Sequence, residues 1–337
     1  MSFTPQEIPT GAVRFNTDSS KMEVYIGSTW MEVSVSTSNL DGGTRGFIQG
    51  GQVAPNSAIT NRIEFITIET QGNATDFGDL TKTYGSSGQG FASRTRGFQA
   101  GGYAYNPIGY IDTIDFWTVS TLGNASDFGD LLGGRQSCSA VSSATRGIIT
   151  PGSNPSVSAE NVIQFVTMAS TGDALDFGDL FQARTHARGV ASPTRGVNIC
   201  GRNPSNVTTM DFITISSTGN ASDFGDNDIY GRGGNASNSI RGIIGGASPA
   251  VNTIKFITIA TKGDSMNFGD MSQTRSDAFA GASRTRVCIG GGYHGTYNTS
   301  NVIDYVNIAT QGDAVDFGDL VQASNEQAGC SNGHGGL

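Results

Sequence analysis

One hydrophobic pattern recurs six times along the chain. In each copy the first, third, fourth and sixth residues of a six-residue segment are apolar and the other two are polar, at residues 63–68, 114–119, 163–168, 210–215, 254–259 and 303–308. Because the side chains of a strand alternate between two faces, this pattern places apolar groups on both faces. It predicts a strand inside a sheet that is packed between neighbouring sheets.

A four-residue phrase, Asp-Phe-Gly-Asp, follows each of these segments. It occupies residues 76–79, 127–130, 176–179, 223–226, 267–270 and 316–319, with Asn for the first Asp in the fifth copy. Successive copies lie 51, 49, 47, 44 and 49 residues apart. A period in this range is typical of a β-propeller or another repeat array. The Asp beside Gly predicts a turn in which the carboxylate accepts backbone N–H groups, and the Phe is expected to fill the space between blades.

The remaining parts of the repeat are also regular. Each unit opens with Thr-Arg-Gly or a close variant, continues with a short apolar strand that ends in glycine, and then has a loop of variable length. After the phrase, small residues alternate with polar ones, as at residues 136–143, 185–192 and 276–283. Small side chains suit the crowded strand nearest the axis of a propeller.

The two ends of the repeat region complement each other. The first unit lacks the small-residue strand, whereas residues 321–331 supply one after the last phrase. We therefore expect the C-terminal strand to complete the first blade and to remove the exposed sheet edges. The strand order resembles kelch repeats over residues 44–337, with Phe and the phrase in place of the spaced Tyr and Trp of kelch units. The predicted fold is all-β: a six-bladed kelch-like β-propeller (residues 41–337) closed by a C-terminal strand, preceded by a small β-hairpin module with its linker (residues 1–40).

The N-terminal module lies outside the repeat. Residues 11–33 predict three short strands separated by turn residues, and residues 34–43 predict a linker. A hairpin of this size is marginally stable alone, so the module is expected to pack on the main body, on a copy of itself or on a partner. The side chains expected at this docking surface are Phe15, Tyr25 and Trp30.

The same stretch resembles a known class of segments. Residues 11–30 follow the form G-x-[IV]-R-F-N-T-x-[ST]-x-K-[ML]-E-x-Y-x-G-x-x-W. This form is similar to N-terminal hairpins of tailed-phage virion proteins, notably fibre and appendage proteins. The resemblance implies a location in the virion, after synthesis in the host cytoplasm, and docking on other virion proteins of the capsid, tail or baseplate through residues 1–40. It also favours a homo-oligomer.

Composition and net charge exclude some classes of binding partner. The chain has 337 residues, 48 of them glycine, and a formal net charge of -9. This charge argues against nucleic acid and weakly against an anionic membrane surface. No apolar run has the length of a transmembrane helix, and the first residues lack the pattern of a secretory signal. Four cysteines without CxxC spacing are expected to be small buried strand residues rather than disulfide partners: Cys138, Cys200, Cys288 and Cys330.

Repeated charges are the first candidate chemistry. The carboxylate oxygens of the phrase are ligands of the kind that calcium binds, but a structural role is favoured over metal binding. The Thr-Arg-Gly arginines have the geometry either to form an anion-binding ring or to pair with phrase aspartates, and pairing is favoured because both recur in every unit. These predicted structural residues are Arg45, Arg96, Arg146, Arg195, Arg241, Arg286, Asp79, Asp130, Asp179, Asp226, Asp270 and Asp319. We expect no cofactor and no catalytic residue, because histidines are scattered and no nucleophile or phosphate-loop motif occurs.

The loops after the glycine pairs break the repeat. Loops at equivalent positions of a propeller emerge on one face, and tyrosine offers rigid amphipathic contact area for protein or glycan recognition. The alternative is that these tyrosines simply cover strand ends. The candidate receptor-facing residues are Tyr103, Tyr105, Tyr110, Tyr293, His294 and Tyr297.

Two classes of function follow. The first is a non-enzymatic virion structural protein of a tailed phage that displays a propeller head for host-surface adhesion, or a capsid decoration protein. The second is a glycan-acting propeller enzyme or a soluble scaffold. An enzyme is expected to carry one pattern-breaking acidic cluster at an end of the channel, and the sequence indicates none.

Overall fold

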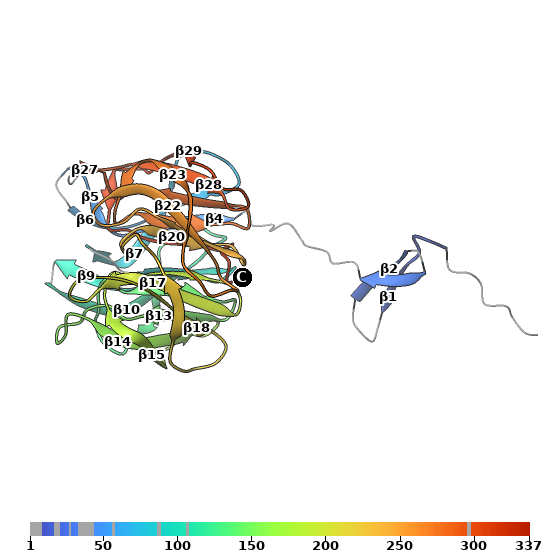
Figure 1. The fold of residues 1–337 in the computed structure, drawn as a ribbon, viewed down its shortest axis with the longest axis horizontal. Helices are drawn as coiled ribbons and strands as arrows, with labels where there is room; N and C mark the ends of the chain where they lie inside the picture. The colour runs from blue at the N-terminus through green and yellow to red at the C-terminus, as the bar shows by residue number, and fades with distance from the viewer. Residues whose placement is uncertain are drawn as a thin grey trace, which may run out of the picture. The chain divides into compact units, whose positions relative to one another are not determined.

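The computed structural model describes residues 9–16, 21–26, 28–32, 44–55, 58–85, 89–105, 108–294 and 298–337. These residues form strands, turns and loops without any helix, which confirms the all-β class (Figure 1). The chain divides into two compact units, Met1–Asp41 and Gly42–Leu337, one residue beyond the predicted boundary. The predicted linker at residues 34–43 lies outside the described residues.

The smaller unit is a three-stranded antiparallel sheet in the order β1-β2-β3. Its strands are β1 (Val13–Asn16), β2 (Lys21–Ile26) and β3 (Thr29–Glu32). The three short strands predicted for this region are therefore confirmed.

Within the described residues, the larger unit contains six antiparallel sheets that share a four-strand arrangement in the order of the sequence repeat. The first of them is extended to six strands by the short strands Gln52–Val53 and Ser324–Asn325, and Tyr293–His294 and Asn298–Thr299 form a separate two-stranded sheet. We number the six sheets by repeat. Sheet 1 consists of β31 (Ala328–Ser331), β4 (Arg45–Gln49), β6 (Ala58–Thr67) and β7 (Thr75–Tyr84). Sheet 2 consists of β8 (Gln89–Ala92), β9 (Arg96–Tyr105), β10 (Ile108–Thr118) and β11 (Ser126–Asp130). Sheet 3 consists of β12 (Ser139–Ser142), β13 (Arg146–Thr150), β14 (Glu160–Thr167) and β15 (Leu175–Arg184).

The other three sheets repeat this arrangement. Sheet 4 consists of β16 (Arg188–Ala191), β17 (Arg195–Arg202), β18 (Asn206–Thr214) and β19 (Ser222–Asp226). Sheet 5 consists of β20 (Gly234–Ser237), β21 (Arg241–Gly245), β22 (Val251–Thr258) and β23 (Met266–Arg275). Sheet 6 consists of β24 (Phe279–Ala282), β25 (Arg286–Gly290), β28 (Val302–Asn307) and β29 (Val315–Asp319). Short loop strands are β5 (Gln52–Val53), β26 (Tyr293–His294), β27 (Asn298–Thr299) and β30 (Ser324–Asn325).

Strand β31 joins the two ends of the repeat region. It pairs with β4, with Cys330 opposite Phe47, so the predicted pairing of the C-terminal strand with the first repeat is confirmed. The first strands of the sheets also contact one another in a cyclic order: β8, β12, β16, β20, β24, β31 and again β8. Every first strand therefore has a first strand of another sheet on either side.

The phrase lies on a strand, so the turn predicted for it is wrong. In sheet 3 the phrase belongs to β15, and Phe177 is buried with a T-shaped contact to Phe165, 6.0 Å between ring centroids. Phe177 packs with Ile213 and Ile215 of sheet 4, which confirms that the Phe fills space between sheets. The turn belongs to the neighbouring sheet, whose Gly219 and Ala221 donate backbone N–H groups to the phrase carbonyls.

The carboxylates of the phrase do not hold this joint. The backbone N–H of Asp179 donates to the side-chain oxygen of Asn220 in the turn of sheet 4, at 3.0 Å. The same contact recurs at every joint, with acceptors Asn73, Asn124, Asp173, Asp264 and Asp313 for the other five phrases. The turn residue therefore supplies the capping oxygen that was assigned to the phrase.

The predicted pairing of the repeat arginines with phrase aspartates is also wrong. Arg146 of sheet 3 lies over the ring of Phe165, 4.9 Å from its centroid, and donates from Nη1 to the carbonyl of Ile215 in sheet 4. The same pair of contacts occurs for Arg45, Arg96, Arg195, Arg241 and Arg286. A carbonyl at the end of a neighbouring third strand is an unpaired acceptor, and a guanidinium satisfies it while its flat face stays on an aromatic ring.

A third joint uses the polar second position of the recurring six-residue segment. Asp211 of sheet 4 is fully buried and binds Arg184 of sheet 3, with Nη2 and Oδ2 2.6 Å apart. Sheets 5 and 6 are joined in the same way by Arg275 and Asp304, 2.9 Å apart. In sheet 2 the buried Asp115 accepts from the hydroxyl of Tyr84 instead. The sequence pattern predicts only that this second position is polar. In the structure, its side chains link successive sheets.

The cysteines are buried and free, which confirms their predicted role as small apolar residues. Cys138 lies just before β12, whereas the other three lie on strands. Burial raises the pKa of the four thiols, so they are poor nucleophiles near neutral pH.

Candidate functional site

The point where the chain enters the larger unit and the candidate receptor loops lie at opposite ends of its strands. The chain enters β4 at Thr44 beside the C-terminal segment, where Arg45 and Asn332 exchange hydrogen bonds. The second strands run from this end toward the glycine-rich loops, so the tip of β9 and the short strands β26 and β27 lie at the other end (Figure 1). The candidate receptor loops are thus opposite the point where the chain enters.

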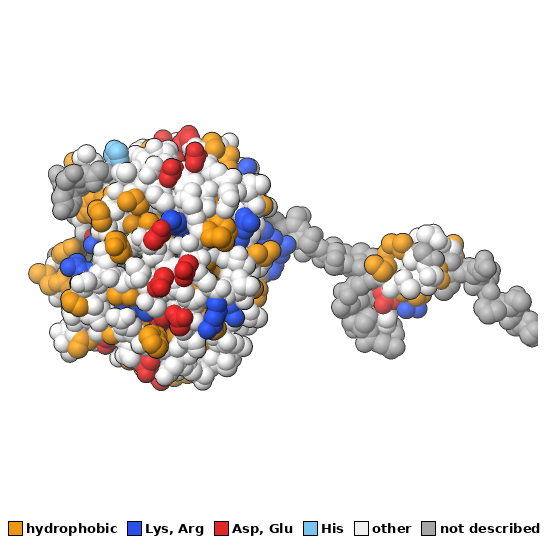
Figure 2. Space-filling model, viewed as in Figure 1, with side chains coloured by type: hydrophobic (Ala, Val, Ile, Leu, Met, Phe, Trp, Pro, Cys, Tyr) orange, Lys and Arg blue, Asp and Glu red, His pale blue; other side chains and the backbone are white. Residues whose placement is uncertain are grey.

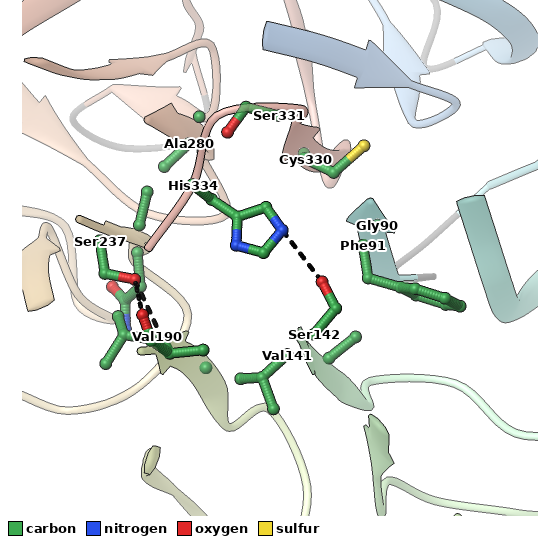
Figure 3. A pocket seen from close by; sticks show the side chains of 17 residues that line it. Gly90, Phe91, Val141, Ser142, Val190, Ser237, Ala280, Cys330, Ser331 and His334 are labelled. Atoms are coloured by element: carbon green, nitrogen blue, oxygen red, sulfur yellow. Dashed lines mark hydrogen bonds between the residues drawn. The ribbon is translucent and has the colours of Figure 1, made fainter. Parts of the chain in front are cut away.

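The cavity among the first strands is small, and the C-terminal segment contributes to its lining. His334 points into it, with Nε2 3.1 Å from the hydroxyl of Ser142 and 2.9 Å from the carbonyl of Ala92 (Figure 3). Gly335 donates its N–H to the carbonyl of Ser237. The remaining space is about 60 Å³, enough for water but not for a ligand of ordinary size. A ligand site must therefore be sought at the loop end.

The tyrosines of the β9–β10 hairpin form one cluster. Tyr103 makes T-shaped ring contacts with Tyr105 and with Tyr110, each 5.4 Å between centroids. Tyr105 is 48% exposed, and its hydroxyl lies 3.5 Å from Gln52 Nε2. The cluster is therefore exposed at Tyr105 and partly buried at Tyr103 and Tyr110, and its role in receptor binding stays a prediction.

The other candidate tyrosines separate. Tyr293 is partly buried on β26, and its backbone pairs with Ser276 through two hydrogen bonds of 3.0 and 2.8 Å. His294 beside it is exposed. Tyr297 lies outside the described residues.

A charged cluster lies at this end, and sequence reasoning missed it. Residues two positions before the first strands adopt left-handed backbone angles, with φ between 53° and 80°: Ser137, His186, Arg232, Asp277 and Glu326. Arg232 binds Asp277 through Nε at 2.7 Å and approaches Glu326 with Nη2 at 3.5 Å. Arg188 stands 4.0 Å from the same Asp277 oxygen. The sequence does contain a sign of this cluster, because these five equivalent positions carry five different residue types.

A polar groove of about 790 Å³ opens beside this charged cluster, within the size range of small-molecule sites. Parts of sheets 4, 5 and 6 line it, including the β26 strand. The lining side chains that matter chemically are Arg202, Asn206, Arg232, Ser248, Asp277 and Tyr293. The groove offers guanidinium, amide and hydroxyl groups at one place on a chain whose net charge is -9.

Burial shifts two titrating groups of the cluster in opposite senses. Burial, with the nearby Asp277 charge, raises the pKa of Glu326 to about 7. Burial, with the positive charge of Arg232, lowers the pKa of His186 to about 3. The ordinary values are 4.5 and 6.5, so in the folded protein Glu326 binds protons more readily than in the unfolded chain and His186 less readily.

These shifts predict opposing pH dependences. Stability due to Glu326 falls as pH rises from 4.5 to 7, whereas stability due to His186 is lost as pH falls from 6.5 toward 3. Between pH 4.5 and 6.5 the two contributions offset each other. We expect Glu326→Gln to leave a free energy of unfolding that rises with pH in this window, and His186→Asn to leave one that falls, each by up to about 1.4 kcal/mol per pH unit. Urea unfolding at several pH values measures both slopes, and variants with the slope of the parent protein would contradict the assignment.

The docking residues predicted on the smaller unit do not share one face. Strand alternation and register place Phe15 with Val13, Met22, Ile26 and Met31, all 46–61% exposed. We call these five residues the apolar face.

The other two predicted residues occupy the opposite side of the sheet. Tyr25 and Trp30 contact each other, 5.3 Å between centroids, and Arg14 lies 4.2 Å from the Trp30 ring while bridging Glu23. Trp30 thus packs within its own sheet, and the large hydrophobic side chains that are exposed among the described residues of this unit are those of the apolar face. Figure 2 shows hydrophobic side chains exposed on this unit, with acidic and basic side chains beside them.

Comparison with known proteins gives no relative: no protein-family model matches the chain, and no curated protein matches its sequence. The resemblances to kelch repeats and to phage virion hairpins therefore stay predictions. Among the described residues no helix is long and apolar enough to cross a membrane. No group of three or more His, Cys, Asp and Glu side chains within the described ranges is arranged to hold a metal ion.

Proposed function

We propose that this chain is a non-enzymatic structural protein of a tailed-phage virion, and that its larger unit is a six-bladed kelch-like β-propeller displayed for attachment to the host surface. Three kinds of contact support a propeller, because each joins sheet to sheet in cyclic order, including sheet 6 to sheet 1. A closed ring of sheets leaves only short, protected sheet edges and so suits a head that is presented to solvent.

The apolar face of the smaller unit is the observation that carries the docking part. Five large apolar side chains stand exposed on a sheet of only three short strands. Such a sheet gains stability when another protein covers its apolar side. The residues lie within the stretch that resembles virion hairpins, so we assign the apolar face to a contact with another virion protein of the capsid, tail or baseplate.

The end of the larger unit that bears the groove is the proposed receptor-binding end. It lies opposite the point where the chain enters β4, so docking and binding use different surfaces. The tyrosine cluster and the polar groove there offer contacts for a host-surface glycan or protein. Attachment rather than capsid decoration is favoured because decoration alone does not require such a groove.

The docking proposal predicts that deletion of residues 1–41 abolishes association with the particle. Because one apolar face is to be covered, the double variant Phe15→Ser, Met31→Ser should have nearly the same effect. The measurement is sedimentation of particles assembled with each variant, followed by detection of the chain. Ile108→Ser, which removes a 75% exposed apolar side chain from the larger unit, is the matched control and should leave association unchanged.

Two results would contradict this assignment. Association that persists after deletion of residues 1–41 would place the docking surface elsewhere. Loss of self-association in the double variant, with particle binding intact, would instead show that the apolar face joins copies of this chain. Light scattering of the purified variants separates these outcomes.

A second candidate function, glycan hydrolysis, has one observation in its favour. Asp277 and Glu326 share Arg232, and a carboxyl with a pKa near 7 has the acidity of a general acid. Against catalysis, Asp277 is only 2% exposed and its carboxylate is bound by arginines. Release of reducing ends from bacterial polysaccharide by the purified chain would favour this second candidate.

A further inference from the structure

We propose that the polar groove binds an acidic saccharide, with Arg202 binding the sugar carboxylate and Arg232 adding positive charge beside it. This inference rests on the proposed attachment function and names the class of ligand. It depends on three features of the groove: an uncompensated guanidinium, a fixed supporting framework, and neutral groups suited to sugar hydroxyls.

Arg202 is the side chain available to an anion. It is exposed at the end of β17, and its Nε donates to the carbonyl of Pro204 at 2.9 Å. Among the described residues no hydrogen bond or ion pair occupies its two terminal nitrogens. A guanidinium held at Nε presents these nitrogens as a pair, which matches the two oxygens of a carboxylate.

Arg232 adds positive charge to the lining of the same groove. Its Nε is committed to Asp277, and its Nη2 is 3.5 Å from Glu326, so its position is fixed rather than free. Arg188 and Arg232 lie beside these two carboxylates, and Arg202 lines the same groove as Arg232. The raised pKa of Glu326 leaves part of its population uncharged at neutral pH, which increases the local positive charge further.

The walls of the groove suit a sugar ring. Ser205, Asn206, Ser248 and Ser276 place hydroxyl and amide groups along it. Tyr293 and Pro249 add surfaces of the kind that pack on the apolar side of a sugar ring. The Tyr293 strand is fixed by its two backbone hydrogen bonds to Ser276, so little ordering is needed when a ligand binds.

A single acidic sugar unit fits these features better than a long polyanion. The chain carries a formal net charge of -9, so an extended phosphate backbone would be repelled outside the groove. A saccharide with one carboxylate places its charge at Arg202 and its hydroxyls along the neutral walls.

The test is isothermal titration calorimetry of the full chain with acidic and neutral oligosaccharides. The acidic probes are trisaccharides that carry glucuronate, galacturonate or N-acetylneuraminate, and the neutral probes are the matched glucose and galactose trisaccharides. We expect at least one acidic probe to bind and its neutral counterpart to bind at least about tenfold more weakly, the scale of one charge-assisted contact.

Variants assign the binding to the groove. Arg202→Gln should weaken the acidic probe by about tenfold, because it removes an exposed charge without disturbing the buried cluster. Arg94→Gln removes an exposed arginine at the opposite end of the strands and should leave binding unchanged. Equal affinity for acidic and neutral probes, no binding of any acidic probe, or unchanged affinity in Arg202→Gln would each overturn the proposal.

This assay is independent of the particle. If the deletion of residues 1–41 fails to release the chain from virions while acidic sugar binds the groove, the docking assignment is wrong and the ligand class stands. If docking behaves as expected and no acidic sugar binds, the ligand class is wrong and the virion function stands.

Discussion

Replacement of Asp211 by alanine should lower the free energy of unfolding by about 3–5 kcal/mol, the usual result of leaving one buried ion without its partner. Arg184 and Asp211 are both fully buried, and the two atoms that join them are 2.6 Å apart. Burial raises the pKa of Asp211 even beside this arginine, so desolvation is a large part of the energy of the pair. Urea unfolding of the variant and of the parent protein measures the difference.

Two control variants test whether the loss of stability comes from leaving one buried charge without its partner. In the double variant Arg184→Met, Asp211→Leu, both charges are absent, so most of the lost stability should return. Asp228→Ala removes a carboxylate that is 69% exposed from its contact with Lys255, and it should cost no more than about 1 kcal/mol. If Asp211→Ala cost as little as Asp228→Ala, the buried joint would not stabilise the fold as argued.

Replacement of Gly178 by alanine should also destabilise strongly, by about 3–5 kcal/mol from backbone strain and steric overlap together. Gly178 is the phrase glycine of sheet 3 and has a φ of +142°. A Cβ atom there would lie 2.5 Å from the carbonyl oxygen of Gly219 in sheet 4. The N–H of Gly219 also donates to the carbonyl of Phe177 in the phrase, so the clash would separate sheets 3 and 4 where their backbones are hydrogen-bonded.

Gly219 provides the matched control for this variant. Its φ is +151°, but a Cβ atom there meets nothing within 4 Å. Gly219→Ala should therefore show backbone strain alone, about 1–2 kcal/mol. Thermal unfolding of both variants gives the comparison, and equal losses would show that the close approach of the sheets contributes nothing.

The repeat made the strands and their order predictable. The period of the phrase, the small-residue strand at the C-terminus and the aromatic third strand led to the correct sheet contents and to the pairing of β31 with β4. These features are local or depend on composition, which a single sequence records directly. The burial of the phrase Phe followed in the same way from its regular spacing.

The contacts between sheets were not predictable in the same way. Arg146 and Asp179 recur together, and this suggested an ion pair, yet their partners are the carbonyl of Ile215 and the side chain of Asn220. Which polar groups meet depends on how successive sheets twist and stack, and the spacing of residues within one repeat does not contain that information. The polar position of Asp211 was visible, but its partner Arg184 belongs to another repeat.

The candidate site was the least predictable part. Arg232, Asp277 and Glu326 are 45 and 49 residues apart in sequence and meet because they occupy the same position of successive repeats. A comparison of this position across the repeats would have indicated the site. A position with a structural role keeps its residue type from repeat to repeat, and this position does not. On the smaller unit, alternation already placed Phe15 on the opposite face from Trp30.

Cryo-electron microscopy of the virion with this chain in place tests the proposed architecture and docking most directly. We expect a closed head of six sheets, attached to the particle through residues 1–41, with the polar groove facing outward. A head that contacts the particle through the groove, an open array of sheets, or particles without the chain would contradict it.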